Sequence, residues 1–406
     1  QIFFLFSNIF YRNFHLNALQ HLQAICKKFI FATSLINMIA NMKFIIYFCV
    51  LIMLFHGIYS QDPDALSGET LKPEYLQNYL DNPVVRAKYN NDPFDNERAI
   101  ILKGKMPYVS GEILNPGQAY VDNLKERTVV VKEFSADKKG KEHEFKGAFQ
   151  YTGYSLSDIV KDFIVSKYNK AEFGLNTDVF VVVENDKGES AVFSWGELFY
   201  SSHNHDIILA TKVQPVFPTA SDDKWTMPDK IRLVASNDYL SVRYIDKPSK
   251  IIIRSFPESF PGSKGIRPLY SPEIEINGPG NNKTIIKDPD IVDDIKLRHE
   301  TVFFGMHKGL RGIENFKGSS LSDLLKDKFN FSDQDLAKGM IAIGAKDAYR
   351  VVFSLSEILN RNDMAEVIII DDPDDKDGRF IIHPGADFFA DRHLKGAKLA
   401  YLIILE

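Results

Sequence analysis

The amino-acid sequence contains an internal repeat, and this repeat constrains the fold more than any other feature. Residues 151–162, YTGYSLSDIVKD, match residues 316–327, FKGSSLSDLLKD, at seven of twelve positions. Two further pairs of segments match in the same order, at offsets that fall from 165 to 160 and then to 149 residues. An ordered repeat of this kind predicts one structural unit present in two copies, the second with shorter connections. The further matches pair Val192-Phe193-Ser194 and Glu197 with Val352-Phe353-Ser354 and Glu357, and Arg243-Tyr244-Ile245 with Arg392-His393-Leu394.

Each copy shows the same predicted order of elements. The apolar residues between Leu156 and Phe163 recur at helical spacing, which predicts a helix. The β-branched run 179–183, a turn at 185–188 and the run 189–193 predict a hairpin. Ser194 and Ser354 each begin a capping box, which predicts a short helix directly after a strand. With the closing strands of each copy, this order predicts an α+β fold built as two tandem mixed α/β domains.

The first sixty residues are expected to lie outside that fold. They contain no acidic residue, and from Met42 they show one basic residue, an apolar run over 44–55 and then small or polar residues. This layout predicts a secretory signal peptide over 42–60, cleaved before Gln61, and a secreted or periplasmic protein. An uncleaved membrane anchor is the alternative, but the run is shorter than the roughly 20 residues that span a bilayer. The predicted organisation is upstream sequence outside the mature protein at 1–41, the signal peptide at 42–60, an N-terminal arm at 61–97, a first domain at 98–256, a Pro/Gly-rich linker at 257–280 and a second domain at 281–406.

Cleavage would change the chemistry available to the chain. Both cysteines, Cys26 and Cys49, would be lost, as would four of the 49 basic residues, while all 54 acidic residues would remain. The mature chain would then carry a net charge of −9, which disfavours a nucleic-acid partner because phosphate binding requires clustered cations. Without cysteine it could form no disulfide and offer no thiolate to a metal.

These segments resemble the molybdopterin-binding domain of sulfite oxidase-type oxidoreductases. The resemblance rests on the helix segment 153–160, the strand and helix segment 187–198, the strand Arg232-Leu233-Val234, and Arg243-Tyr244-Ile245 followed by Ile251. The segment 101–116 is similar to the family's opening, and the second copy fits the same outline with Gly318, Leu321, Asp323, Phe353 and Glu357. The family resemblance implies a molybdopterin cofactor and molybdenum redox chemistry.

The resemblance fails where the family's chemistry takes place. The family holds molybdenum through a cysteine just after the strand that here spans 128–135, and neither Glu133 nor Ser135 supplies a soft thiolate. The resemblance places Arg232 and Arg243, together with Glu133 and Ser135, as candidate cofactor-binding residues; Arg254 also lies near the matching strands. The alternative for each arginine is a surface ion pair at the end of a strand.

Other polar clusters have both a functional and a structural interpretation. His203 and His205 have the spacing of a metal site, although their segment is typical of a polar turn. The acidic segment 371–378 suggests calcium, but its spacing differs from a calcium loop and favours a hairpin tip. A third group suggests acid–base chemistry or a role in the core: His383, His393, Asp387 and Asp391. Asn282 and Asn330 have the form of glycosylation acceptors.

The sequence therefore leads to two main hypotheses about function, beside a third in which both copies form only a structural surface protein with no small ligand. The favoured one is an exported, non-catalytic module that binds a small anionic ligand or a protein partner, with no cofactor and no metal. In this hypothesis the membrane is involved only through the signal peptide. The alternative is a molybdopterin-dependent oxidoreductase in which an oxygen ligand replaces the cysteine.

Overall fold

A computed structural model describes residues 99–136, 143–216, 224–287, 297–306, 309–372, 374 and 378–406. The described residues all belong to one compact unit. The predicted upstream segment, signal peptide and arm all lie outside the described residues. No helix within the described ranges is long and apolar enough to cross a membrane.

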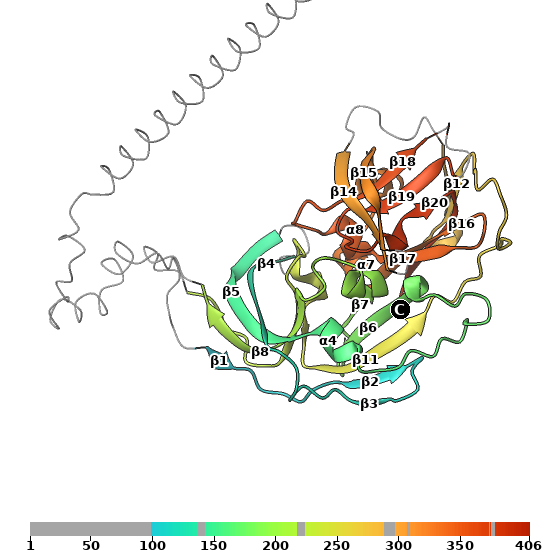
Figure 1. Cartoon of the computed structure of the whole chain (residues 1–406). Helices are drawn as coiled ribbons and strands as arrows, with labels where there is room; N and C mark the ends of the chain where they lie inside the picture. Colours follow the sequence, from blue (N-terminus) through green and yellow to red (C-terminus); the bar gives the residue numbers. More distant parts are fainter. Residues whose placement is uncertain are drawn as a thin grey trace, which may run out of the picture. The chain divides into compact units, whose positions relative to one another are not determined.

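Strands dominate the described chain and form four sheets (Figure 1). The first sheet has the order β10-β9-β8-β5-β4, with β1 paired to β8: Ile245–Asp246, Arg232–Ala235, Ile207–Pro215, His143–Ser155, Arg127–Ala136 and Ile100–Ile101. The second has the order β3-β2-β11-β6-β7: Gly117–Gln118, Tyr108–Gly111, Pro248–Ser255, Val179–Asn185 and Ser190–Ser194. We call residues 99–256, which contain these two sheets, the first half.

The second half, residues 274–406, contains the other two sheets. The third sheet has the order β13-β12-β21-β16-β17: Lys283–Ile286, Ile274–Asn277, Ala397–Ile404, Gly339–Ala345 and Arg350–Ser354. The fourth has the order β14-β15-β18-β19-β20: Leu297–Gly305, Gly309–Ser320, Val367–Asp371, Phe380–Pro384 and Leu394–Lys395. Pairing is antiparallel except between β2 and β11 and between β12 and β21. Strand β12 falls within the predicted linker 257–280.

The prediction of an α+β fold built as two separate domains is wrong. The described helices are short, the longest being α6, Leu321–Lys328, whereas strand β5 alone spans thirteen residues. The helix predicted from the spacing after Leu156 exists as α4, Leu156–Val160, but a turn follows it before Phe163. Helices α5, Trp195–Phe199, and α8, Leu355–Leu359, likewise end after five residues. Apolar spacing located α4, and serine caps located α5 and α8, but these short helices are a small part of a mainly β structure.

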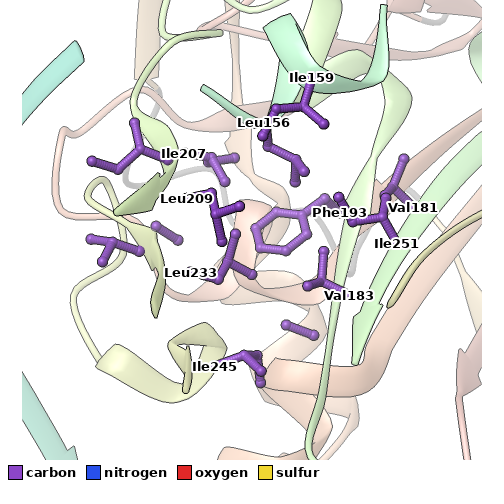
Figure 2. Packing of buried hydrophobic residues seen from close by; sticks show 14 of the residues in the cluster. Leu156, Ile159, Val181, Val183, Phe193, Ile207, Leu209, Leu233, Ile245 and Ile251 are labelled. Atoms are coloured by element: carbon purple, nitrogen blue, oxygen red, sulfur yellow. The ribbon is translucent and has the colours of Figure 1, made fainter. Parts of the chain in front are cut away.

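Each sheet packs against two others, an arrangement like that of a four-bladed propeller. Apolar side chains fill the space between the first and second sheets, where Phe193 packs among Leu209, Leu233 and Val183 (Figure 2). A similar core lies between the third and fourth sheets. A smaller cluster, including Phe180 and Met340, joins the second sheet to the third. Isolated bridges from Ser201 to Asp387 and from Asp238 to Arg361 link segments between the elements of the first half to segments of the second half.

Candidate functional site

The structure brings together two of the four predicted cofactor-binding residues. Glu133 lies on β4 and Arg232 on β9, and Arg232 Nη1 donates to both carboxylate oxygens of Glu133 at 3.1 Å. Ser135, two residues further along β4, is paired with Glu144 of β5. Arg243 lies in the 3-10 helix η2, Ser241–Arg243, and belongs to a different group of contacts.

The guanidinium of Arg232 is held between two carboxylates. Its Nε and Nη2 donate to Asp246 at 2.5 and 3.3 Å, while Nη1 also donates to the Tyr151 hydroxyl at 3.2 Å. Tyr151 in turn donates to Glu133. Burial raises the pKa of Tyr151, and the nearby negative charge of Glu133 adds to this effect. Every nitrogen of Arg232 therefore already has an acceptor within the protein.

Arg243 is almost wholly buried, with 1% of its surface exposed. Its Nε and Nη2 donate to Asp238 at 2.7 and 2.5 Å, and its Nη2 and Nη1 donate to Glu197 at 2.7 and 3.0 Å. Burial alone would lower the pKa of Arg243, but these two carboxylates outweigh it and raise that pKa. Nη1 also reaches Ser354 Oγ, on the second half, at 3.2 Å.

Arg392 repeats this arrangement in the second half. It donates to Asp387 at 2.8 and 2.5 Å and to Glu357 at 2.5 Å. Its Nη1 reaches Ser194 Oγ, on the first half, at 3.1 Å. Each arginine also lies over a phenylalanine ring of its own half, at 4.4 Å for Arg243 and 4.5 Å for Arg392. We call these contacts the central network, with members Ser194, Glu197, Asp238, Arg243, Ser354, Glu357, Asp387 and Arg392.

Each half contributes to the other half's part of the central network. Ser194 Oγ donates to Glu357 at 2.7 Å, and Ser354 Oγ donates to Glu197 at 3.1 Å. Four pairs of residues therefore occupy matching places, at the offsets of 160 and 149 seen in the sequence. Those offsets were the signal that could have identified the network, because they already paired Arg243 with Arg392 and Glu197 with Glu357.

The residues placed for molybdopterin do not fit that cofactor. The donor set at β4 consists of a carboxylate and a hydroxyl, without the soft thiolate that molybdenum requires there. Both arginines expected to bind its phosphate are already bonded to two carboxylates. A phosphate would have to displace these carboxylates and would be repelled by them.

The histidines considered from the sequence take part in local contacts. His203 Nδ1 lies 3.1 Å from Asp206 in a turn, and His205 Nδ1 lies 3.2 Å from Ser155 Oγ. In the ranges that the structure describes, no group of three or more His, Asp or Glu residues could hold a metal ion. The acidic segment 371–378 is described only in part, and there Asp371 pairs with Arg379.

His383 and His393 lie together, with their Nδ1 atoms 3.2 Å apart. His383 is buried, and its ring packs on Phe316 with centroids 4.2 Å apart. Burial lowers the pKa of His383 to about 3, and the neighbouring His393 adds to that effect. The predicted partner Asp387 is instead bonded to Arg392, so the structure does not assemble the acid–base cluster.

His393 also lines a cleft of about 430 Å³, which no sequence pattern predicted. Its apolar wall includes Leu269, Phe303 and Tyr349, and its charged residues include Arg267 and Arg311. These residues come from separate elements and share no motif, so only the folded chain brings them together.

Comparisons with known proteins identify no family. No family model matches the chain, and no curated protein matches it. A similar solved structure is the crystal structure of the sulfane dehydrogenase SoxCD from Paracoccus pantotrophus. The two chains are 9% identical, the match covers 61% of this chain and 68% of the other, and the TM-score is 0.27.

Proposed function

We propose that this chain is a non-catalytic binding or interaction module that carries no molybdopterin. The main support for this proposal is that Arg232 and Arg243 are each already bonded to two carboxylates. The resemblance to sulfite oxidase-type oxidoreductases rests on sequence segments, and the residues that it would use for the cofactor are already bonded to one another. These carboxylate pairs support a structural role for both arginines.

Metal analysis of the full chain tests this proposal. The protein is expressed in a host that makes molybdopterin, purified without chelators, and examined by elemental analysis and by absorbance. We expect no stoichiometric molybdenum and no cofactor absorption band. Stoichiometric molybdenum would overturn the proposal and support the alternative, an oxidoreductase with an oxygen ligand in place of cysteine.

We also propose that the module is exported. The basic residue, apolar run and polar end of 42–60 support cleavage before Gln61. Expression with residues 42–60 intact in a secreting host should release protein whose N-terminus is Gln61. Retention of the apolar run in the recovered protein would contradict cleavage.

We further propose that the two halves arose by duplication of one β-rich unit. The sequence matches support this, and so does the central network, in which an arginine, two carboxylates and a serine recur in matching places. In this proposal each copy supplies two of the four sheets, and the four sheets form one compact group.

A further inference from the structure

The cleft of about 430 Å³ has a counterpart at a matching place in the repeat. A recess of about the same volume is lined there by Lys187 and Tyr244 of the first half and by Asp333 of the second, among others. The offsets of 160 and 149 residues place Asp347 and His393 of the cleft at the positions of Lys187 and Tyr244. The repeated fold therefore produces two related recesses, and the side chains that line each one decide what it can bind.

The cleft contains two arginines, Arg267 and Arg311, whose guanidinium groups form no close ion pair with a carboxylate of the described residues. Other arginines of the described residues, including Arg232, Arg243, Arg350, Arg379 and Arg392, lie within 2.9 Å of a carboxylate oxygen. Arg267 Nη1 donates to the Ile266 carbonyl at 2.9 Å and lies 3.8 Å from Asp347, and the side chain is 59% exposed. Arg311 is exposed, with its guanidinium 5.7 Å from the Phe303 ring centre, and within the described ranges it pairs with no carboxylate.

The acidic groups of the cleft are bonded to the backbone. Asp391 Oδ2 accepts the Met306 N–H at 3.0 Å, and Asp347 Oδ1 accepts the Tyr349 N–H at 3.1 Å. These bonds hold both carboxylates in place and partly offset their charge. The guanidinium groups are therefore the polar groups of the cleft best able to bind an incoming ligand, and they select an anion.

The rest of the cleft suits a flat apolar body. Leu269, Phe303 and Leu394 contribute apolar surface, and Phe303 presents an aromatic ring. The Tyr349 hydroxyl donates to the Asp391 carbonyl at 2.6 Å, so the aromatic ring of Tyr349 is the part that forms one side of the cleft. A volume of about 430 Å³ falls within the range of small-molecule sites, roughly 300–1,000 Å³.

We infer that this cleft binds a small aromatic carboxylate. The ring of the ligand packs against Phe303 and Tyr349, and its carboxylate accepts hydrogen bonds from Arg311 and Arg267. This inference rests on the proposed function in treating the chain as a binding module, and it uses residues other than those placed for molybdopterin.

Titration of the full chain with indole-3-acetate tests the inference, with neutral indole-3-acetamide as the matched ligand. Calorimetry should show saturable binding of the acid, about tenfold tighter than that of the amide. Arg311→Gln and Arg267→Gln should each weaken binding of the acid by about five- to tenfold. The control is Arg298→Gln, an exposed arginine on β14 outside the cleft, which should leave binding unchanged.

Three results would overturn the inference: no saturable binding at millimolar acid, equal binding of acid and amide, or an effect of Arg298→Gln as large as that of Arg311→Gln. Thermal melts of each variant establish that it is folded. Stoichiometric molybdenum together with Arg311-dependent binding would overturn only the proposed function. Absence of both molybdenum and ligand binding would overturn only the inference that the cleft binds an aromatic carboxylate.

Discussion

A buried guanidinium group is stable only when oppositely charged partners surround it. Arg243 and Arg392 are 1% and 0% exposed, and each is bonded to two carboxylates of its own half. Removing charges from water costs several kcal/mol per ion, and only well-placed partners offset that cost. The central network therefore makes each of its members depend on the others. Deleting one arginine would leave two carboxylates buried without their cation.

Arg243→Met should consequently destabilise the protein by about 3–5 kcal/mol, because Asp238 and Glu197 lose their cation while remaining buried. The control is Arg254→Met, an exposed arginine on β11, which should change stability by less than about 0.5 kcal/mol. Urea unfolding followed by circular dichroism measures both. Equal stability of the two variants would show that the network contributes little.

A second prediction concerns His383. Burial of this residue lowers its pKa to about 3. An unfolded chain protonates this imidazole near its ordinary pKa of about 6.5, whereas the folded protein keeps it neutral. The unfolded state therefore binds more protons between these values, and His383 lowers stability as pH falls, by up to about 1.4 kcal/mol per unit. Its contribution is favourable above pH 6.5 and is lost progressively below it.

His383→Phe isolates this effect, because a phenyl ring can pack on Phe316 but cannot titrate. Unfolding free energies of both proteins should be measured from pH 7 to pH 4. We expect the stability of the variant to fall less steeply with acidification than that of the wild type. Parallel pH profiles would contradict a buried neutral His383.

Short helices and hairpins were predictable where residues close together in the sequence determine them. Serine caps located helices α5 and α8, since Ser194 and Ser354 each accept the backbone N–H three residues on. The run 179–193 predicted the hairpin that β6 and β7 form. Helix length was not predictable from spacing alone, and the error made a mainly β protein look like an α+β one. The repeat paired Arg243 with Arg392, but the contacts of the central network were not predictable, because Arg243 finds its acceptors 5, 46 and 111 residues away.

The helix caps are not equivalent, and a comparison of two of them gives a third prediction. The exposed Ser332 caps α7, Asp333–Lys338, through a capping box that it forms with Asp335. Ser332→Ala should cost about 1 kcal/mol. Ser354 caps α8 but also contacts Arg243 and Glu197 of the other half. Ser354→Ala should cost at least about 2 kcal/mol, because buried charged groups lose a partner as well.

Urea denaturation of the two alanine variants measures this difference. Both changes remove one hydroxyl from a helix N-cap, so the comparison separates capping from the contacts between halves. Equal losses of stability would show that the contacts of Ser354 with Arg243 and Glu197 add nothing to its role as a cap.

At the scale of the whole molecule, two different kinds of contact join the halves. One is the central network, in which Ser194 and Ser354 each bond to charged groups of the opposite half. The other is the apolar cluster between the second and third sheets. Phe260, within the predicted linker, belongs to this cluster and packs on Tyr401 with ring centres 5.1 Å apart. The chain that connects the halves is thus itself part of their interface.

These contacts predict that the two halves unfold together. Both tryptophans of the chain, Trp195 and Trp225, lie in the first half, so their fluorescence reports on that half and on its contact with the second half, whereas circular dichroism reports on all four sheets. In urea the two signals should give the same midpoint. Arg392→Met, in the second half, should move the fluorescence midpoint as far as the dichroism midpoint, because loss of that arginine weakens a network shared with Ser194. A fluorescence midpoint that stays in place while dichroism shifts or separates into two steps would mean that the first half is stable without the second.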